Sequence, residues 1–171
     1  MKVLVAVASR HGSTAEIAQT IGEQLRSDGH DVVVAAPEEV VTLARTEAMV
    51  LGSALYVGHW EPAAVRLAER AGAELDGRPV WLFSSGPVGR PEGKFTRQMA
   101  VDPAELPKVL AQTKALGHRI FPGKLDRYQL HGLQRAALGV FRGMEGDFRD
   151  WTAVRSWADG ISAQLGRRAS H

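Results

Sequence analysis

The first 26 residues hold the feature that most restricts the fold of this chain: an apolar run, a short hydroxyl-rich loop and an amphipathic segment. Val3–Ala8 is almost entirely apolar, which is typical of a strand buried on both faces. Thr14–Arg26 places Ile17, Ile21 and Leu25 on one helical face. We therefore predict a strand, a tight turn and a helix, with the free N–H groups of the first helical turn facing the loop.

The loop Ser9–Thr14 has the composition of a phosphate site. Its hydroxyl groups can donate to an anion, and Gly12 lets the backbone approach closely. It lacks the lysine of a Walker A loop and the three glycines of a dinucleotide fingerprint, so a phosphomonoester is the ligand that fits. The alternative is an ordinary capped helix, with Ser13 or Thr14 as the N-cap.

The alternation of apolar strands and helices continues through the chain. It predicts a doubly wound α/β fold, in which a five-stranded parallel sheet forms the middle layer of a three-layer α/β/α sandwich. We expect a single domain over residues 1–171, with an insert at 124–150 before the last helix. Further strands are predicted at Asp31–Ala36, Ala48–Ser53, Arg78–Ser84 and His118–Pro122, and further helices at Glu61–Ala73, Pro107–Leu116 and Trp151–Leu165, with a short helical or irregular crossover at Pro37–Ala44.

Composition excludes several classes of function. The chain has no cysteine, so thiolate catalysis, iron–sulfur clusters and disulfides are excluded. The six histidines show no ligand spacing, and we expect no metal site. A net charge of +2 is too small to indicate nucleic-acid binding. Because no stretch of about 18 apolar residues is present, we expect a cytoplasmic protein.

Three loops should meet at the carboxyl ends of the strands, where open α/β sheets bind ligands. They are Ser9–Thr14, Ser53–Trp60 and Ser84–Lys94. The second loop carries two large aromatic side chains, and the third is rich in glycine. A phosphate pocket beside these two loops suits a planar heterocycle on a phosphorylated tail.

The residues resemble the flavodoxin family, and within it the menaquinone-dependent protoporphyrinogen oxidase branch. The resemblance covers nearly the whole chain and rests on four stretches. These are Ser9–Gly12, Leu51–Ser53 with Tyr56–His59, Phe83–Ser85 with Arg90–Glu92, and Phe121–Leu125.

The resemblance implies FMN as the cofactor. Carried over residue by residue, it assigns the phosphate to Ser9, Arg10, His11, Gly12, Ser13 and Thr14, one side of the ring to Ser53, Ala54, Leu55, Tyr56, Val57 and Gly58, and the other side to Ser84, Ser85, Gly86, Pro87 and Gly89. Tyr56 or Trp60 can stack on the flavin, or either can belong to the core. His59 is a candidate proton shuttle; the alternative is an exposed loop residue.

The resembled branch implies two-electron transfer between a protoporphyrinogen-like substrate and a quinone. Arg90 and Lys94 in the third loop, with Arg97 nearby, outnumber the one acid, Glu92, and would stabilise the reduced, anionic flavin, which favours this chemistry. One alternative is a one-electron carrier flavodoxin. Another is a binding protein that keeps the fold without the flavin, because His11 stands where the family has a hydroxyl side chain.

The insert is basic from Lys124 to Met144. This stretch has one acidic residue, Asp126, and four lysine or arginine residues: Lys124, Arg127, Arg135 and Arg142. A basic amphipathic helix there could rest on an anionic membrane, where a lipid quinone is reached. The alternative is a helix that covers the sheet or a second copy of the chain in a homodimer.

Overall fold

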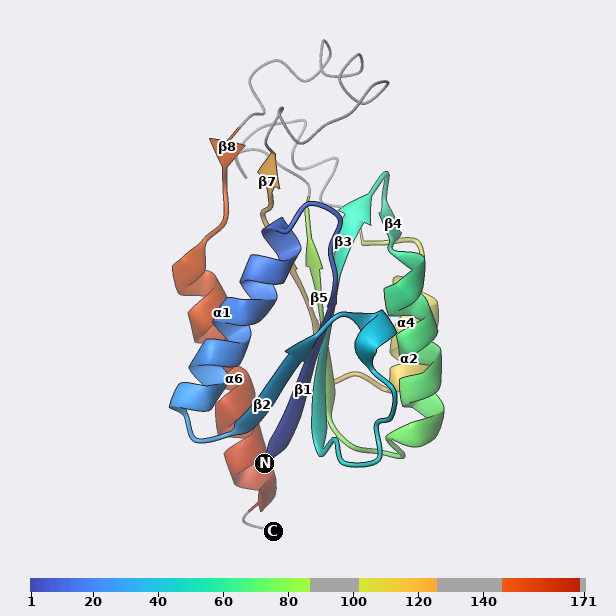
Figure 1. The fold of residues 1–171 in the computed structure, drawn as a ribbon, viewed down its shortest axis with the longest axis vertical. Coiled ribbons are helices and arrows are strands. Elements are labelled where there is room, and N and C mark those ends of the chain that lie inside the picture. The colour runs from blue at the N-terminus through green and yellow to red at the C-terminus, as the bar shows by residue number, and fades with distance from the viewer. Residues whose placement is uncertain (87–101, 126–145, 170–171) are drawn as a thin grey trace.

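The computed structural model describes residues 1–86, 102–125 and 146–169. Strands and helices alternate along most of the chain (Figure 1). In order they are β1 (Lys2–Ala8), α1 (Ser13–Ser27), β2 (Asp31–Ala35), the 3₁₀ helix η1 (Pro37–Glu39), β3 (Ala48–Tyr56), β4 (His59–Trp60), α2 (Pro62–Glu74), β5 (Val80–Ser85), α4 (Leu106–Thr113), β6 (His118–Phe121), β7 (Lys124–Leu125), β8 (Gly146–Asp147) and α6 (Trp151–Ala169).

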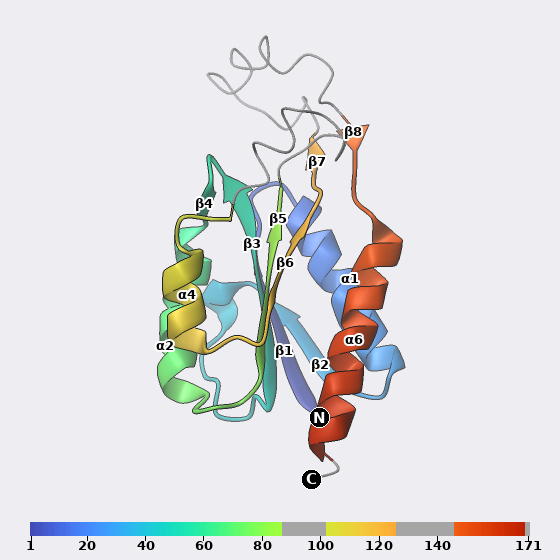
Figure 2. The same ribbon diagram turned by 180° about the vertical axis from the view of Figure 1, so that it is seen from behind.

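Five parallel strands form the middle layer in the order β2-β1-β3-β5-β6. The chain moves outward from β1 in one direction and then in the other, which is the doubly wound arrangement. Helices α1 and α6 cover one face of the sheet, and α2 and α4 cover the opposite face (Figures 1 and 2). The predicted three-layer fold is confirmed. The short strand β4 pairs antiparallel with β3 and adds a sixth strand that the sequence pattern did not predict.

Strand β1 shows why this sheet needs helices on both faces. Its alternate residues pack into two separate cores. Val3, Val5 and Val7 belong to the core under α1 and α6. Leu4, Ala6 and Ala8 belong to the core under α2 and α4. All six are buried, as expected for a central parallel strand.

An aromatic cluster fills the core under α1 and α6 near the carboxyl end of the sheet. The rings of Phe83, Phe121 and Trp157 meet edge to face, with centroids 5.6 to 6.1 Å apart. Gly52 makes room for this cluster, because a Cβ there would lie 2.1 Å from the Phe83 ring. The glycine in the middle of β3 is therefore required by packing.

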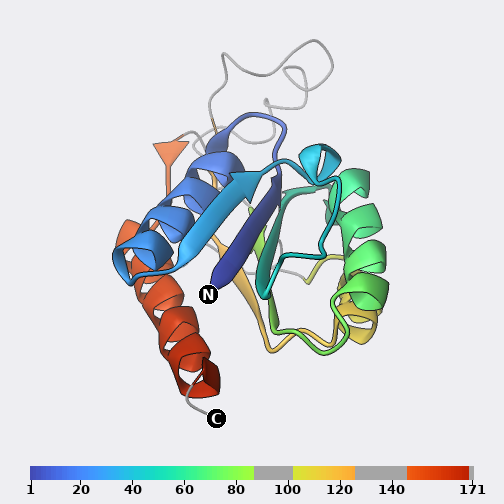
Figure 3. The same ribbon diagram turned by 60° about the horizontal axis from the view of Figure 1, so that its bottom comes forward.

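The two ends of the sheet differ in what they carry. The carboxyl ends of the strands meet the loop after β1, the β3–β4 connection and the ribbon β7–β8 (Figure 1). Met1 and the end of α6 lie at the amino end of the sheet (Figure 3). Among the described residues, no helix is both long enough and apolar enough to cross a membrane.

Candidate functional site

The loop after β1 presents unpaired donors at the start of α1. Gly12 is the N-cap of this helix, with φ of 81°, and no side chain caps it. Ser13 is already helical, so the prediction of Ser13 or Thr14 as the N-cap is wrong. The first helical hydrogen bond runs from the Glu16 N–H to the Gly12 carbonyl, which leaves the preceding N–H groups without helical partners.

Ser9 adds a hydroxyl group to the same loop. Its Oγ is buried and has no hydrogen-bond partner among the described residues. A buried hydroxyl without a partner is costly, and such groups occur where a ligand completes them. A Cβ built on Gly12 would have nothing within 4 Å, so the space above the loop is open. The loop therefore fits a phosphate, which supplies acceptors to both sets of donors.

Arg10, which the resemblance assigned to the phosphate, contacts two other side chains in this structure. Its Nε lies 2.7 Å from Oε1 of Glu61, and its guanidinium lies 4.4 Å above the ring of Tyr56. The side chain therefore connects the phosphate loop to the β3–β4 connection. The next residue, His11, is exposed.

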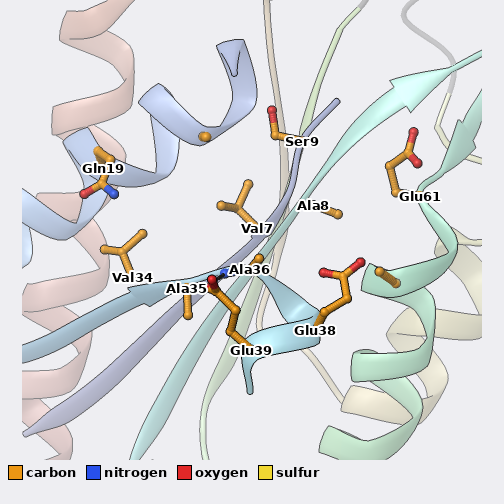
Figure 4. Close-up of a pocket in the computed structure, with 12 residues that line it drawn as sticks. Val7, Ala8, Ser9, Gln19, Val34, Ala35, Ala36, Glu38, Glu39 and Glu61 are labelled. Atoms are coloured by element: carbon orange, nitrogen blue, oxygen red, sulfur yellow. Dashed lines mark hydrogen bonds between the residues drawn. The ribbon is translucent and has the colours of Figure 1, made fainter. Parts of the chain in front are cut away.

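A cavity of about 330 Å³ lies beside the phosphate loop, where β1 and β2 end. Its floor is apolar and includes Val7 and Val34, while Ser9 lies at its upper edge (Figure 4). The carboxylates of Glu38, Glu39 and Glu61 line its rim. Because these carboxylates would repel a second phosphate, the cavity does not extend the anion site.

The second predicted loop is a β-hairpin. Strand β3 continues to Tyr56, and Tyr56 pairs with His59 of β4. Val57 and Gly58 form the turn, with φ of 51° and 79°. Left-handed backbone at both central positions matches a type I′ turn, whose twist suits a two-residue hairpin. The prediction of a loop over residues 53–56 is therefore wrong, although the predicted ring-flanking residues lie together on this hairpin.

The hairpin tip presents an apolar surface to solvent. Val57 is 82% exposed and Tyr56 is 41% exposed. A β-branched residue with positive φ is uncommon because its side chain is crowded by the backbone. Backbone strain of this kind is concentrated at ligand-binding sites. The tip is thus a candidate wall for a planar ligand.

Ser53 and Ser84, both predicted to contact the ligand, have fully buried side chains. Ser53 Oγ accepts a hydrogen bond from the Glu61 N–H, and Ser84 Oγ accepts one from the Trp60 indole. Both hydroxyl groups therefore hold the hairpin and the start of α2. Trp60 is 3% exposed and belongs to the core under α2 and α4, so it does not stack on a ligand.

His59 is bound to a carboxylate. Its Nδ1 lies 2.7 Å from Oε1 of Glu105, and the other carboxylate oxygen accepts the Trp60 N–H. Partial burial raises the pKa of Glu105, but the hydrogen bonds from Trp60 and His59 outweigh it and lower the pKa overall. The Ala104 N–H also donates to the Gly58 carbonyl. The segment before α4 therefore fastens the hairpin, and His59 takes part in this contact.

Two residues missed by the sequence prediction lie against the phosphate loop. The Lys124 N–H donates to Ser13 Oγ, which brings β7 onto the start of α1. Arg149 is 4% exposed and pairs with Glu16 at 2.7 Å and with Asp147 at 2.5 Å. The hydrogen bonds that Arg149 donates to the Asp147 carboxylate raise the pKa of Arg149 and lower that of Asp147. Only the basic composition of the insert hinted at such a contact.

Of the third predicted loop, Ser84–Lys94, the structure describes the first three residues, 84–86. Ser85 is the last residue of β5, and the Gly86 N–H donates to the Phe121 carbonyl. Ala54 pairs with Ser85 and, with Leu55, is partly buried. Thr14 is buried at the start of α1. Pro87 and Gly89 lie outside the described residues, as do Arg90, Lys94 and Arg97.

Comparison with known proteins adds information on family and fold. The family model described as a flavodoxin domain matches residues 4–152. No curated protein matches the chain. A flavodoxin from the domain Archaea shares 16% identity with a TM-score of 0.58, covering 97% of this chain and 99% of that chain.

Two further solved structures have the same fold. A Streptococcus pneumoniae TIGR4 flavodoxin shares 18% identity with a TM-score of 0.62, covering 96% of this chain and 99% of that chain. Rubredoxin oxygen:oxidoreductase from Desulfovibrio gigas shares 13% identity with a TM-score of 0.64, and 99% of this chain matches 37% of that chain. At these identities the comparisons establish a shared fold.

Proposed function

The chain belongs to the flavodoxin domain family, and from this premise we propose that it is an FMN-dependent oxidoreductase. The family implies FMN as the cofactor. In the proposed reaction, two electrons pass from an organic substrate resembling protoporphyrinogen to a quinone. The protein provides the phosphate anchor, the ring site and the local charge, while bound FMN supplies the redox chemistry.

The residues of the loop after β1 fit the phosphate of FMN. The buried Ser9 hydroxyl and the uncapped start of α1 both have donors without partners. A phosphate would satisfy these donors together and would interact favourably with the helix dipole. Gly12 leaves the approach open. Ser9, Gly12, Ser13 and Thr14 are therefore the proposed phosphate residues.

The hairpin and the end of β5 fit the ring. Tyr56 is the exposed aromatic residue of the hairpin, and the Arg10 guanidinium packs on it. Glu61 holds Arg10 from the other side. These contacts would hold the Tyr56 ring in a fixed orientation for stacking. Ser85 and Gly86 would offer backbone groups to the opposite side of the ring.

The observation that carries the substrate proposal is where the chain between β6 and α6 begins and ends. Both ends of this segment lie at the carboxyl end of the sheet, where β7 pairs with β8. Lys124 and Arg149 fasten these ends to the first turn of α1. A substrate-binding segment would need this placement beside the cofactor.

Contact of residues 124–144 with an anionic membrane is part of this proposal, because a lipid quinone is reached there. The alternative is that the same face pairs with a second copy of the chain. Most of this stretch lies outside the described residues. Binding to anionic vesicles, compared between the wild type and the double variant Arg135→Glu/Arg142→Glu, separates the two. Unchanged vesicle binding would exclude the membrane role.

A one-electron carrier is the second candidate, and the charges of the described residues favour it. Arg10 is paired with Glu61, and Arg149 is paired with Glu16 and Asp147. Neighbouring carboxylates reduce the stabilisation that these arginines would give to a reduced, anionic flavin. The excess positive charge that favours two-electron chemistry would then come from Arg90, Lys94 and Arg97.

A flavin titration followed by a redox titration tests the proposal. We expect bound FMN with a shifted visible absorbance, and a single two-electron transition on reduction. Turnover of a quinone with protoporphyrinogen would complete the assignment. Two separate one-electron transitions without quinone turnover would establish the carrier instead. A protein that binds no FMN would overturn both.

A further inference from the structure

A buried hydrogen-bond chain under the hairpin involves a histidine that the proposed function does not use. The Trp60 indole Nε1 donates to Ser84 Oγ at 2.8 Å. Ser84 Oγ lies 2.8 Å from Nε2 of His118. The Ser84 side chain is fully buried, and the His118 side chain is 9% exposed. These hydrogen bonds therefore connect β4, β5 and β6 inside the core.

The chemistry of the donors assigns the protons. An indole N–H can only donate, so Ser84 Oγ accepts from Trp60. Ser84 Oγ could accept a second hydrogen bond, but its own hydrogen would then have no acceptor among the contacts described for this buried side chain, so every group is paired when Ser84 donates to His118 Nε2. The imidazole is therefore neutral and carries its proton on Nδ1, which lies 3.7 Å from Oδ1 of Asp102.

The hydrogen-bond chain Trp60–Ser84–His118 holds the hairpin at its base. Trp60 pairs with Leu55 of β3, so the position of its indole also determines where the hairpin tip lies. Ser84 directly precedes Ser85 and Gly86, which are the proposed contacts on the other side of the ring. A side chain that holds Trp60 and Ser84 together thus sets the separation of the two sides of the ring site.

We propose that His118 is a positioning residue for the flavin ring: its neutral imidazole accepts from Ser84, keeps Trp60 in place, and releases this arrangement when it gains a proton. The proposal rests on the proposed FMN site. His118 acts through Ser84 and Trp60 and takes no part in electron transfer.

Protonation breaks the hydrogen-bond order of the chain. With both ring nitrogens as donors, Ser84 Oγ would have to accept from His118 and from Trp60, and its own hydrogen would lose its acceptor. Burial opposes this change and lowers the pKa of His118, while the Asp102 carboxylate partly offsets burial. Trp60, Ser84 and Leu82 around the ring are uncharged, so Asp102 is the charged group that faces it among the described residues.

Two substitutions separate the acceptor from the titratable proton. His118→Gln can place an amide oxygen near the Nε2 position, where it accepts from Ser84 and cannot gain a proton in this range. His118→Leu removes the acceptor. Riboflavin is the probe beside FMN, because it lacks the phosphate, whose own titration near about pH 6 would otherwise contribute.

Affinity for both flavins is measured by fluorescence between about pH 5 and about pH 8. The wild type should lose about tenfold or more in affinity for riboflavin on acidification, while His118→Gln keeps its affinity nearly constant. His118→Leu should bind weakly at both limits. Tryptophan fluorescence of the flavin-free proteins should report the same transition in the wild type alone.

The outcomes separate this role from the cofactor assignment. If His118→Gln followed the wild-type pH curve while both bound flavin, the positioning role would be overturned and the FMN site would stand. Wild-type affinity in His118→Leu would have the same meaning. If the wild type bound neither flavin at about pH 8, the FMN site and the role of His118 would both be refuted. The comparison of the wild type with His118→Gln decides the question even if His118→Leu fails to fold.

Discussion

The phosphate loop and the β3–β4 hairpin lie at the same end of the sheet but differ in how their polar groups are satisfied. In the phosphate loop, the Ser9 hydroxyl is buried without a partner and the start of α1 has no side-chain cap. In the hairpin, Ser84, Glu105 and Ser53 each bind a polar group of β4 or of the adjoining Glu61. One region depends on a ligand to complete its hydrogen bonds, and the other is complete without it.

Serine hydroxyl groups therefore have two different roles in these two regions. A hydroxyl in the hairpin network contributes to the stability of the flavin-free fold. A buried hydroxyl without a partner, such as that of Ser9, would contribute to ligand affinity and would weaken the flavin-free fold slightly. Serine-to-alanine substitutions at three positions can test this, because the chemical change is the same each time.

The largest effect is expected for Ser84→Ala. This change leaves the Trp60 indole and His118 Nε2 without their buried partner. We expect the free energy of unfolding to fall by about 2 to 3 kcal/mol in urea denaturation. Ser13→Ala is the control, because the Ser13 hydroxyl accepts one exposed hydrogen bond, and it should cost under about 0.5 kcal/mol. Equal losses in both variants would remove the distinction between the two regions.

Ser9→Ala should affect binding and stability in opposite directions. The variant removes a buried hydroxyl that lacks a partner, so stability should stay constant or rise by up to about 1 kcal/mol. Affinity for FMN should fall about tenfold, which corresponds to about 1.4 kcal/mol. Isothermal titration with FMN and with riboflavin checks this, since riboflavin affinity should not change. An equal loss of affinity for FMN and for riboflavin would show that the Ser9 hydroxyl does not contact the phosphate.

Acidification should destabilise the fold through two histidines, one of which, His118, lies under the hairpin. Burial lowers the pKa of His118 below its ordinary value of about 6.5, and burial, together with the positive N-terminus, lowers that of His30. Below about pH 6.5 the unfolded chain therefore binds protons that the folded chain resists, and stability falls as the pH drops.

Thermal unfolding midpoints measured between about pH 5 and about pH 8 give the dependence of stability on pH. His118→Gln and His30→Gln should each flatten it. The double variant with the wild-type slope would show that other groups dominate. Recovery of stability on acidification would contradict the expected sign.

Val57→Asn should produce the smallest effect, at the exposed tip of the hairpin. Asparagine tolerates positive φ better than a β-branched residue, and Asn-Gly is a favoured type I′ pair. We expect a gain of about 0.5 to 1 kcal/mol in unfolding free energy. Flavin affinity should decrease if the exposed valine contacts the ring. A loss of stability would mean that φ at Val57 is not strained.

The sequence pattern was sufficient to predict the three layers of the fold. Strands buried on both faces appear as continuous apolar runs, and amphipathic helices appear as apolar residues at helical spacing. The strands predicted at Val3–Ala8, Ala48–Ser53 and Arg78–Ser84 correspond to the parallel strands β1, β3 and β5. The hairpin was missed because Tyr56 to Trp60 carries no alternating pattern over so short a length. The Val57–Gly58 pair also differs from the usual Asn-Gly signal.

The candidate site was predicted in position better than in detail. The phosphate loop lies where the strand-loop-helix pattern placed it, because that pattern determines the helix start. The partners of Arg10, Ser53 and Ser84 depend on contacts between distant segments, such as Ser84 with Trp60 and His118. No local pattern encodes these contacts, and the histidines gave no signal of which one would be buried.

The position of the chain ends has a practical consequence. Met1 and the last turn of α6 lie at the amino end of the sheet, opposite the hairpin and the phosphate loop (Figure 3). An affinity tag, a surface linker or a fused redox module could be joined at either end and leave the flavin edge facing outward. Immobilised on an electrode through its C-terminal helix, the protein would present the proposed flavin site to dissolved partners, and electron transfer between FMN and those partners could be recorded as a current.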